Sequence, residues 1–216
     1  MKRKIIIVSL LTISAIGLFY GLNHLRAANE TDSDQDKTVN MPDLKSWPAA
    51  SQKAAKEMES KYGKPNGVTS DMLEWNNNGI WLKTIVYKKE MIHNFPQLHT
   101  DVLEQWVNYS VPLNNYDELA FYNGSVTANR TNGTISSRCN NEAINLLSLN
   151  LAYDILNNSK TVAQARIQHG KDELDFTNGK KPQYTQYMHF IGDKTAPDPD
   201  KTLDPEMFED TDAEEM

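Results

Sequence analysis

The fold is decided by residues 71–112, which read DMLEWNNNGIWLKTIVYKKEMIHNFPQLHTDVLEQWVNYSVP. Apolar and polar residues alternate over 72–75, and a run of bulky and β-branched residues occupies 80–88. Alternation with a period of two is typical of a half-buried strand. Between the two runs, Asn78-Gly79 supplies the positive φ angles of a tight turn. The stretch therefore predicts a β-hairpin.

A third strand is predicted over residues 102–111, where apolar residues fall on one face and Glu104 and Asn108 on the other. The segment before it, residues 91–101, contains one proline and two histidines. We expect this segment to form a loop between the second and third strands. Because binding and catalytic residues concentrate on loops, it is the first place to look for a functional site.

A second hairpin is predicted around the turn Asn132-Gly133. A two-residue turn would pair Val126 with Cys139 and place both on the apolar side of the ribbon. The Cys139 side chain is therefore expected to point into the core.

Helical spacing and capping residues predict four helices, at Ser46–Tyr62, Tyr116–Tyr122, Ala143–Leu156 and Thr161–Phe176. The third of these has the broadest apolar stripe and must pack against the sheet. The pattern predicts an α+β fold. Its small antiparallel sheet is built from two hairpins and a third central strand, and helices cover one face.

The N-terminus, residues 1–28, is typical of a signal peptide or an uncleaved signal anchor. Three basic residues follow Met1, and residues 5–22 carry no charge. A helix of that length spans roughly 27 Å, just enough to cross a bilayer. Because the basic residues stay in the cytoplasm, the rest should be exported. The protein is then periplasmic or otherwise extracytoplasmic, either anchored through residues 5–22 or secreted after cleavage.

The remainder is expected to comprise an acidic linker at residues 29–42, a single α+β domain at 43–192 and a disordered acidic tail at 193–216. The tail carries ten acidic residues and two lysines, a charge of −8, so the other residues contribute +1 to the total of −7. The domain is near neutral, which argues against nucleic acid as a partner. The single cysteine cannot form an intramolecular disulfide, as fits a bacterial envelope protein.

Two resemblances support this placement. Residues 46–88, with the phrase KYGKPNGVTSDMLEW, resemble small bacterial envelope lipoproteins with a helix and three strands. Longer phrases within residues 46–170, HNFPQLHTDVLEQWVNYSVP, YNGSVTANRTNGTISSRCNNEAINLLSLNLAYDI and TVAQAR, resemble an uncharacterised family of bacterial exported envelope proteins. The likeness implies an exported single domain and no known activity.

A transition-metal site is one hypothesis for the 91–101 segment. His93, His99 and Asp101 offer two imidazoles and a carboxylate, which such metals bind at about 2.0–2.2 Å. The alternative is that the histidines simply hydrogen-bond to the backbone of an irregular loop. The sequence indicates no other cofactor.

Cys139 suggests a different chemistry. It precedes the long helix, whose free backbone N–H groups would favour a thiolate. With His99 as base and Asp101 as orienting group, this arrangement would be that of a thiol hydrolase. The alternative, favoured by the predicted register, is a buried small apolar side chain. We therefore assign no catalytic residue.

Arg130 and Arg138 lie on the second hairpin and are candidate anion contacts. The alternative is a structural ion pair with Glu142 at the start of the following helix. Similarly, Trp75, Trp81 and Trp106 are candidates for an apolar groove, with burial in the core as the preferred interpretation.

The sequence favours a non-enzymatic, membrane-tethered envelope protein that acts through contacts with another envelope protein, by strand addition at a sheet edge. It contains no nucleotide-binding loop, serine-centred elbow or paired-cysteine metal motif. The first alternative is a metal-binding envelope protein using His93, His99 and Asp101. The second is a thiol hydrolase.

Overall fold

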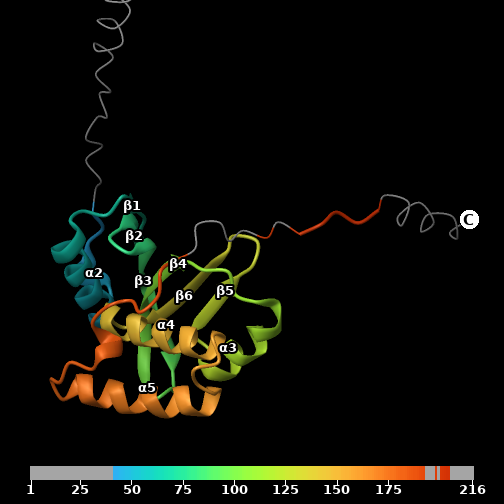
Figure 1. The fold of residues 1–216 in the computed structure, drawn as a ribbon. Coiled ribbons are helices and arrows are strands. Elements are labelled where there is room, and N and C mark those ends of the chain that lie inside the picture. The colour runs from blue at the N-terminus through green and yellow to red at the C-terminus, as the bar shows by residue number, and fades with distance from the viewer. Residues whose placement is uncertain (1–40, 193–197, 199, 205–216) are drawn as a thin grey trace, which may run out of the picture. The chain divides into compact units, whose positions relative to one another are not determined.

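The computed structural model describes residues 41–192, 198 and 200–204. They form one six-stranded antiparallel sheet in the order β1-β2-β3-β4-β6-β5, with helices packed against it (Figure 1). The predicted α+β fold is therefore confirmed. The predicted leader, almost all of the predicted linker and most of the predicted tail lie outside the described residues.

The elements follow one another along the chain with short connections. The strands are β1 (Gly67–Val68), β2 (Met72–Asn78), β3 (Trp81–His93), β4 (His99–Asn108), β5 (Val126–Asn129) and β6 (Thr134–Cys139). The helices are α2 (Ala49–Tyr62), α3 (Tyr116–Tyr122), α4 (Glu142–Leu156) and α5 (Val162–Thr177). Short 3-10 turns are η1 (Leu44–Ser46), η2 (Leu113–Asn115) and η3 (Gln183–Thr185). All four predicted α-helices form within a few residues of their predicted bounds.

Strand β3 is longer than the sequence suggested, and β4 begins three residues earlier than predicted. The predicted loop over residues 91–101 is wrong, because β3 continues to His93, β4 begins at His99, and these two residues pair directly. Only residues 94–98, which include Pro96, connect the strands. Beyond an irregularity in the register, β3 and β4 pair again, from Met91 with Asp101 to His93 with His99. The backbone of these residues is therefore part of the sheet.

The first hairpin turn lies one residue later than predicted. Asn78 pairs with Trp81, so Gly79 and Ile80 form the turn. Gly79 has φ 72°, a left-handed conformation that glycine adopts without steric cost.

The second hairpin has a longer loop than predicted, and its register is shifted. Val126 pairs with Ser137 rather than with Cys139, because residues 130–133 all lie in the connection. A shift of two residues keeps every side chain on its original face. Cys139 is therefore still buried, with 5% of its surface exposed.

One face of the sheet is covered by both α2 and α4. Gln105, fully buried on β4, lies 4.0 Å from Met58 Sδ of α2 and donates to Glu142 Oε2 of α4 at 3.0 Å. Trp75 and Trp81 are buried as the core interpretation predicts. The third tryptophan, Trp106, is half-buried under the Lys83 ammonium group, 4.3 Å from the ring centroid.

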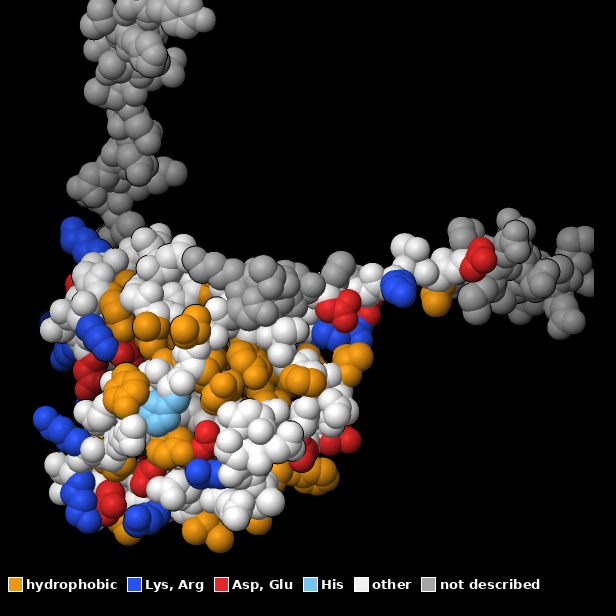
Figure 2. Space-filling view, viewed as in Figure 1, with side chains coloured by type: hydrophobic (Ala, Val, Ile, Leu, Met, Phe, Trp, Pro, Cys, Tyr) orange, Lys and Arg blue, Asp and Glu red, His pale blue; other side chains and the backbone are white. Residues whose placement is uncertain are grey.

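Within the described part of the chain, no helix combines the length and apolar character needed to cross a bilayer. The predicted membrane segment, residues 5–22, lies outside that part. Figure 2 shows apolar side chains gathered across the middle of one face, with basic and acidic side chains interleaved along its side.

Candidate metal centre

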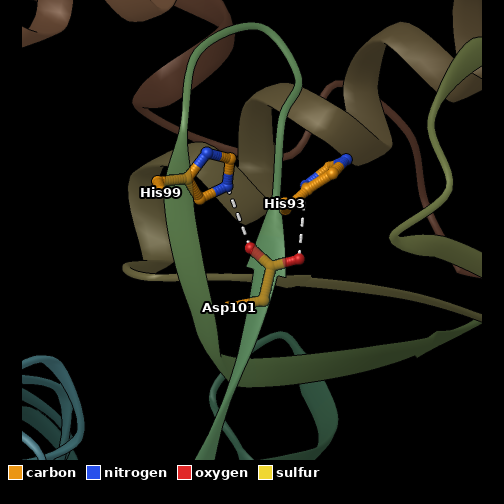
Figure 3. Close-up of side chains that lie close together, drawn as sticks. All are labelled: His93, His99 and Asp101. Atoms are coloured by element: carbon orange, nitrogen blue, oxygen red, sulfur yellow. Dashed lines mark ion pairs between the residues drawn. The ribbon is translucent and has the colours of Figure 1, made fainter.

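Strand pairing brings His93, His99 and Asp101 onto one side of the sheet. His93 pairs with His99 across β3 and β4, and Asp101 lies two residues further along β4. Residues two apart on a strand point to the same face. The two imidazole rings consequently stand beside the Asp101 carboxylate, each linked to one of its oxygens (Figure 3).

The distances are those of a compact set of donors. His99 Nε2 lies 2.9 Å from Asp101 Oδ1, and His93 Nδ1 lies 3.3 Å from Asp101 Oδ2. One ligand atom from each residue lies within 4.8 Å of the other two. Neighbouring ligands of a tetrahedral zinc ion are about 3.4 Å apart. Small side-chain movements would therefore bring all three onto one ion.

The Asp101 carboxylate is buried, and its two oxygens have different partners. Its side chain is 3% exposed. Ser125 donates a hydrogen bond to Oδ2, whereas Oδ1 forms an ion pair with His99 Nε2 at 2.9 Å. His99 Nε2 is close to Oδ1 without the alignment of a hydrogen bond. A buried carboxylate needs a positive partner, and a bound metal ion would take that place from the protonated His99 ring.

His99 is oriented as metal-binding histidines usually are. Its Nδ1 lies 2.9 Å from the Gln97 carbonyl oxygen, so we assign the Nδ1 proton to that bond. Nε2 is then directed into the cluster, and a backbone carbonyl fixes the ring. In the metal-free protein, the Asp101 carboxylate, followed by Cys139, raises the pKa of His99 well above 6.5.

The pKa of His93 is shifted in the opposite direction. Burial lowers its pKa below 6.5, and the attraction of Asp101 only partly offsets this effect. A neutral imidazole is the form that binds metals. His93 is therefore in a ligand-ready state at neutral pH, with Nδ1 also 3.2 Å from Ser125 Oγ.

Cys139 lies next to the cluster, in contact with His99, but its geometry differs from that of a hydrolase relay. Its Sγ lies 3.5 Å from His99 Nε2, the same nitrogen that faces Asp101. In a thiol relay, the orienting carboxylate would hold the other ring nitrogen. Burial also raises the pKa of the Cys139 thiol, which disfavours a nucleophilic thiolate. These features weigh against the thiol-hydrolase hypothesis.

The loop between β3 and β4 is held by α5, a contact that the sequence analysis missed. The Phe95 ring lies 3.9 Å from the Arg166 guanidinium carbon and 5.0 Å from the His169 ring. His169 is fully buried, with Nδ1 2.9 Å from the Tyr122 hydroxyl and Nε2 3.3 Å from Glu173. The one available signal was a histidine in an otherwise ordinary helix, and nothing local connects it to Phe95.

The two hairpin arginines lie outside this cluster. Arg138 stacks over the Tyr87 ring at 4.0 Å and donates to the Lys89 carbonyl at 3.0 Å, while Arg130 pairs with Asp198 and Asp200. The predicted ion pair with Glu142 is wrong. Arg138 alternates with Cys139 along β6 and so points to the face opposite α4.

Comparisons with known proteins give no relative. No family model, no curated protein and no solved structure matches the chain. The resemblance to bacterial envelope proteins stays a prediction, and function has to be argued from the geometry.

Proposed function

We propose that the protein binds one divalent transition-metal ion, Zn²⁺ in the simplest case, through His93, His99 and Asp101. The observation that carries this proposal is the convergence of the two histidine rings on the buried Asp101 carboxylate, with one ligand atom from each residue within 4.8 Å of the others. Two imidazoles and a carboxylate suit Zn²⁺, copper, iron and nickel better than Mg²⁺ or Ca²⁺, which prefer oxygen ligands throughout.

Metal binding at this position would join the ends of β3 and β4. The ligands come from both strands, so the complete site exists only when the hairpin has formed. A ligand that binds only the folded state stabilises it by about 2.7 kcal/mol when present at 100 times its dissociation constant. The metal would therefore stabilise the part of the sheet that holds it.

Titration calorimetry of the full chain tests the proposal. We expect one zinc ion per chain and an affinity that rises at least about tenfold per pH unit between pH 6 and 8. The sign follows from the raised pKa of His99, because metal-free His99 carries a proton over this range and zinc must displace it. Absence of saturable binding would contradict the proposal, and a pH-independent affinity would contradict the role of His99.

We propose further that the protein acts outside the cytoplasm. The supporting features are the uncharged stretch at residues 5–22, the basic residues before it and the resemblance to exported envelope proteins. Alkaline phosphatase fused to the carboxyl terminus should be active, because that enzyme matures only in an oxidising compartment. Export would be contradicted if the phosphatase fusion were inactive and a reporter that works only in the cytoplasm, fused at the same carboxyl terminus, were active.

Contact with another envelope protein is the second candidate function. The edge strands β1 and β5 are short, which limits strand addition. A groove of about 590 Å³ is the better docking candidate, because it is lined by apolar residues that include Trp81 and Val107. Ile80 and Ile191 on its rim are 55% and 94% exposed. A photo-crosslinker at Ile80 should capture a partner in cells, whereas one at the exposed Ile167 on α5 should not.

A further inference from the structure

We infer that Cys139 is the fourth ligand of the proposed metal ion, which makes the centre a closed site with two histidines, one aspartate and one cysteine. This inference rests on the proposed metal-binding function and extends it. It assigns to the thiol a role other than that of a nucleophile.

The first argument is position. Cys139 pairs with Leu103 across β6 and β4, and Asp101 lies two residues before Leu103 on the same face. Cys139 and Asp101 are thus diagonal neighbours, and side chains in that relation can reach one another. The distance from Cys139 Sγ to His99 Nε2 is 3.5 Å. Sulfur and nitrogen ligands of a tetrahedral zinc ion are separated by roughly the same distance.

The second argument is that one ring nitrogen, His99 Nε2, faces two other side chains. Asp101 Oδ1 and Cys139 Sγ both face His99 Nε2, at 2.9 and 3.5 Å. A ring nitrogen carries at most one proton and cannot serve two acceptors well. The Asp101 side chain is 3% exposed, so its carboxylate depends on protein groups or a bound ion for its partners. A cation among the three atoms would coordinate all of them.

The third argument is charge balance. A divalent ion held by neutral histidines and one carboxylate leaves a net positive charge among side chains that are mostly buried. Buried net charge is costly. A thiolate from Cys139 brings the total to zero, and a metal ion deprotonates a coordinating thiol on binding. The buried position of Cys139 therefore fits a ligand that ionises only when the metal arrives.

A closed set of four protein ligands has consequences for the kind of metal site. Structural zinc sites have four protein ligands, whereas catalytic sites keep one position for water or substrate. Thiolate also favours Zn²⁺, Co²⁺ and copper over Mn²⁺ and Mg²⁺. The centre would accordingly hold its metal firmly and stabilise the β3–β4–β6 region rather than activate water.

Cobalt substitution of the full chain tests the fourth ligand. The wild-type protein loaded with one Co²⁺ should show the near-ultraviolet charge-transfer absorption of a cobalt–thiolate bond and the intense visible bands of tetrahedral cobalt. Cys139→Ala should lose the charge-transfer absorption and bind Co²⁺ about 100-fold more weakly. This loss is at least as large as the one caused by removing a group that hydrogen-bonds to a metal ligand. Ser137→Ala, two residues away on the same strand, should change neither.

The outcomes separate the two proposals. Stoichiometric Co²⁺ binding without thiolate absorption would overturn the fourth ligand and leave the three-residue site standing. No Co²⁺ binding by the wild-type protein would overturn both. If Cys139→Ala fails to fold by circular dichroism, the wild-type absorption spectrum alone decides the question.

Discussion

Replacing His99 with alanine is expected to weaken zinc binding by about 100-fold or more. His99 is the most central of the proposed ligands, because its Nε2 contacts both Asp101 and Cys139. Its ring is also fixed from behind by the Gln97 carbonyl. Competition with a chromophoric zinc chelator would measure the loss directly.

His189→Ala is the matched control for that change. His189 lies between the rings of Tyr184 and Tyr187, at 4.7 and 5.0 Å, and belongs to no cluster of metal-ligating side chains found among the described residues. Its removal should leave the zinc affinity unchanged within a factor of about two. Equal affinities for the His99 variant and the wild-type protein would remove His99 from the site.

Leu147→Ala is expected to lower the free energy of unfolding by about 2–5 kcal/mol. Leu147 is fully buried in α4, within the larger of the two apolar clusters. The substitution removes buried apolar atoms and leaves a cavity that the packed sheet and helices can only partly close. Equilibrium urea unfolding, with a chelator present so that metal binding does not mask the change, would measure it.

Leu174→Ala makes the same chemical change on α5, where the side chain is 50% exposed. We expect that variant to lie within about 0.5 kcal/mol of the wild-type protein. Equal losses for Leu147→Ala and Leu174→Ala would mean that α4 does not cover the core as described.

The helices were predictable from the sequence because their signals are local. The apolar stripe of α4 repeats at helical spacing, and Thr161 and Gln164 cap α5 in the reciprocal arrangement that the sequence indicates. A helix carries its hydrogen bonds within one segment, so spacing and caps largely define it. The predicted bounds therefore differ from the observed ones by only a few residues.

The strand ends and turns were less predictable because they depend on partners elsewhere in the chain. Residues 91–101 look irregular alone, yet β3 and β4 pair with each other as far as His93 and His99. The second hairpin allows loops of different length, and the observed register pairs Val126 with Ser137. Sequence patterns do not contain these choices.

The candidate site was partly predictable for the same reason. His93, His99 and Asp101 are near neighbours in the sequence, which groups them as candidates, and the structure places them together by strand pairing rather than in a loop. The contacts of Phe95 with Arg166 and His169 join segments far apart in the chain. They depend on how α5 packs, which no local pattern specifies.

Anomalous scattering at the zinc absorption edge, from crystals of the protein grown with zinc, tests the metal centre most directly. We predict one strong peak about 2.0–2.2 Å from His99 Nε2, a ring nitrogen of His93 and an oxygen of Asp101. The proposed site would be contradicted if zinc-saturated crystals showed anomalous peaks only at other positions while His99 still contacted Asp101.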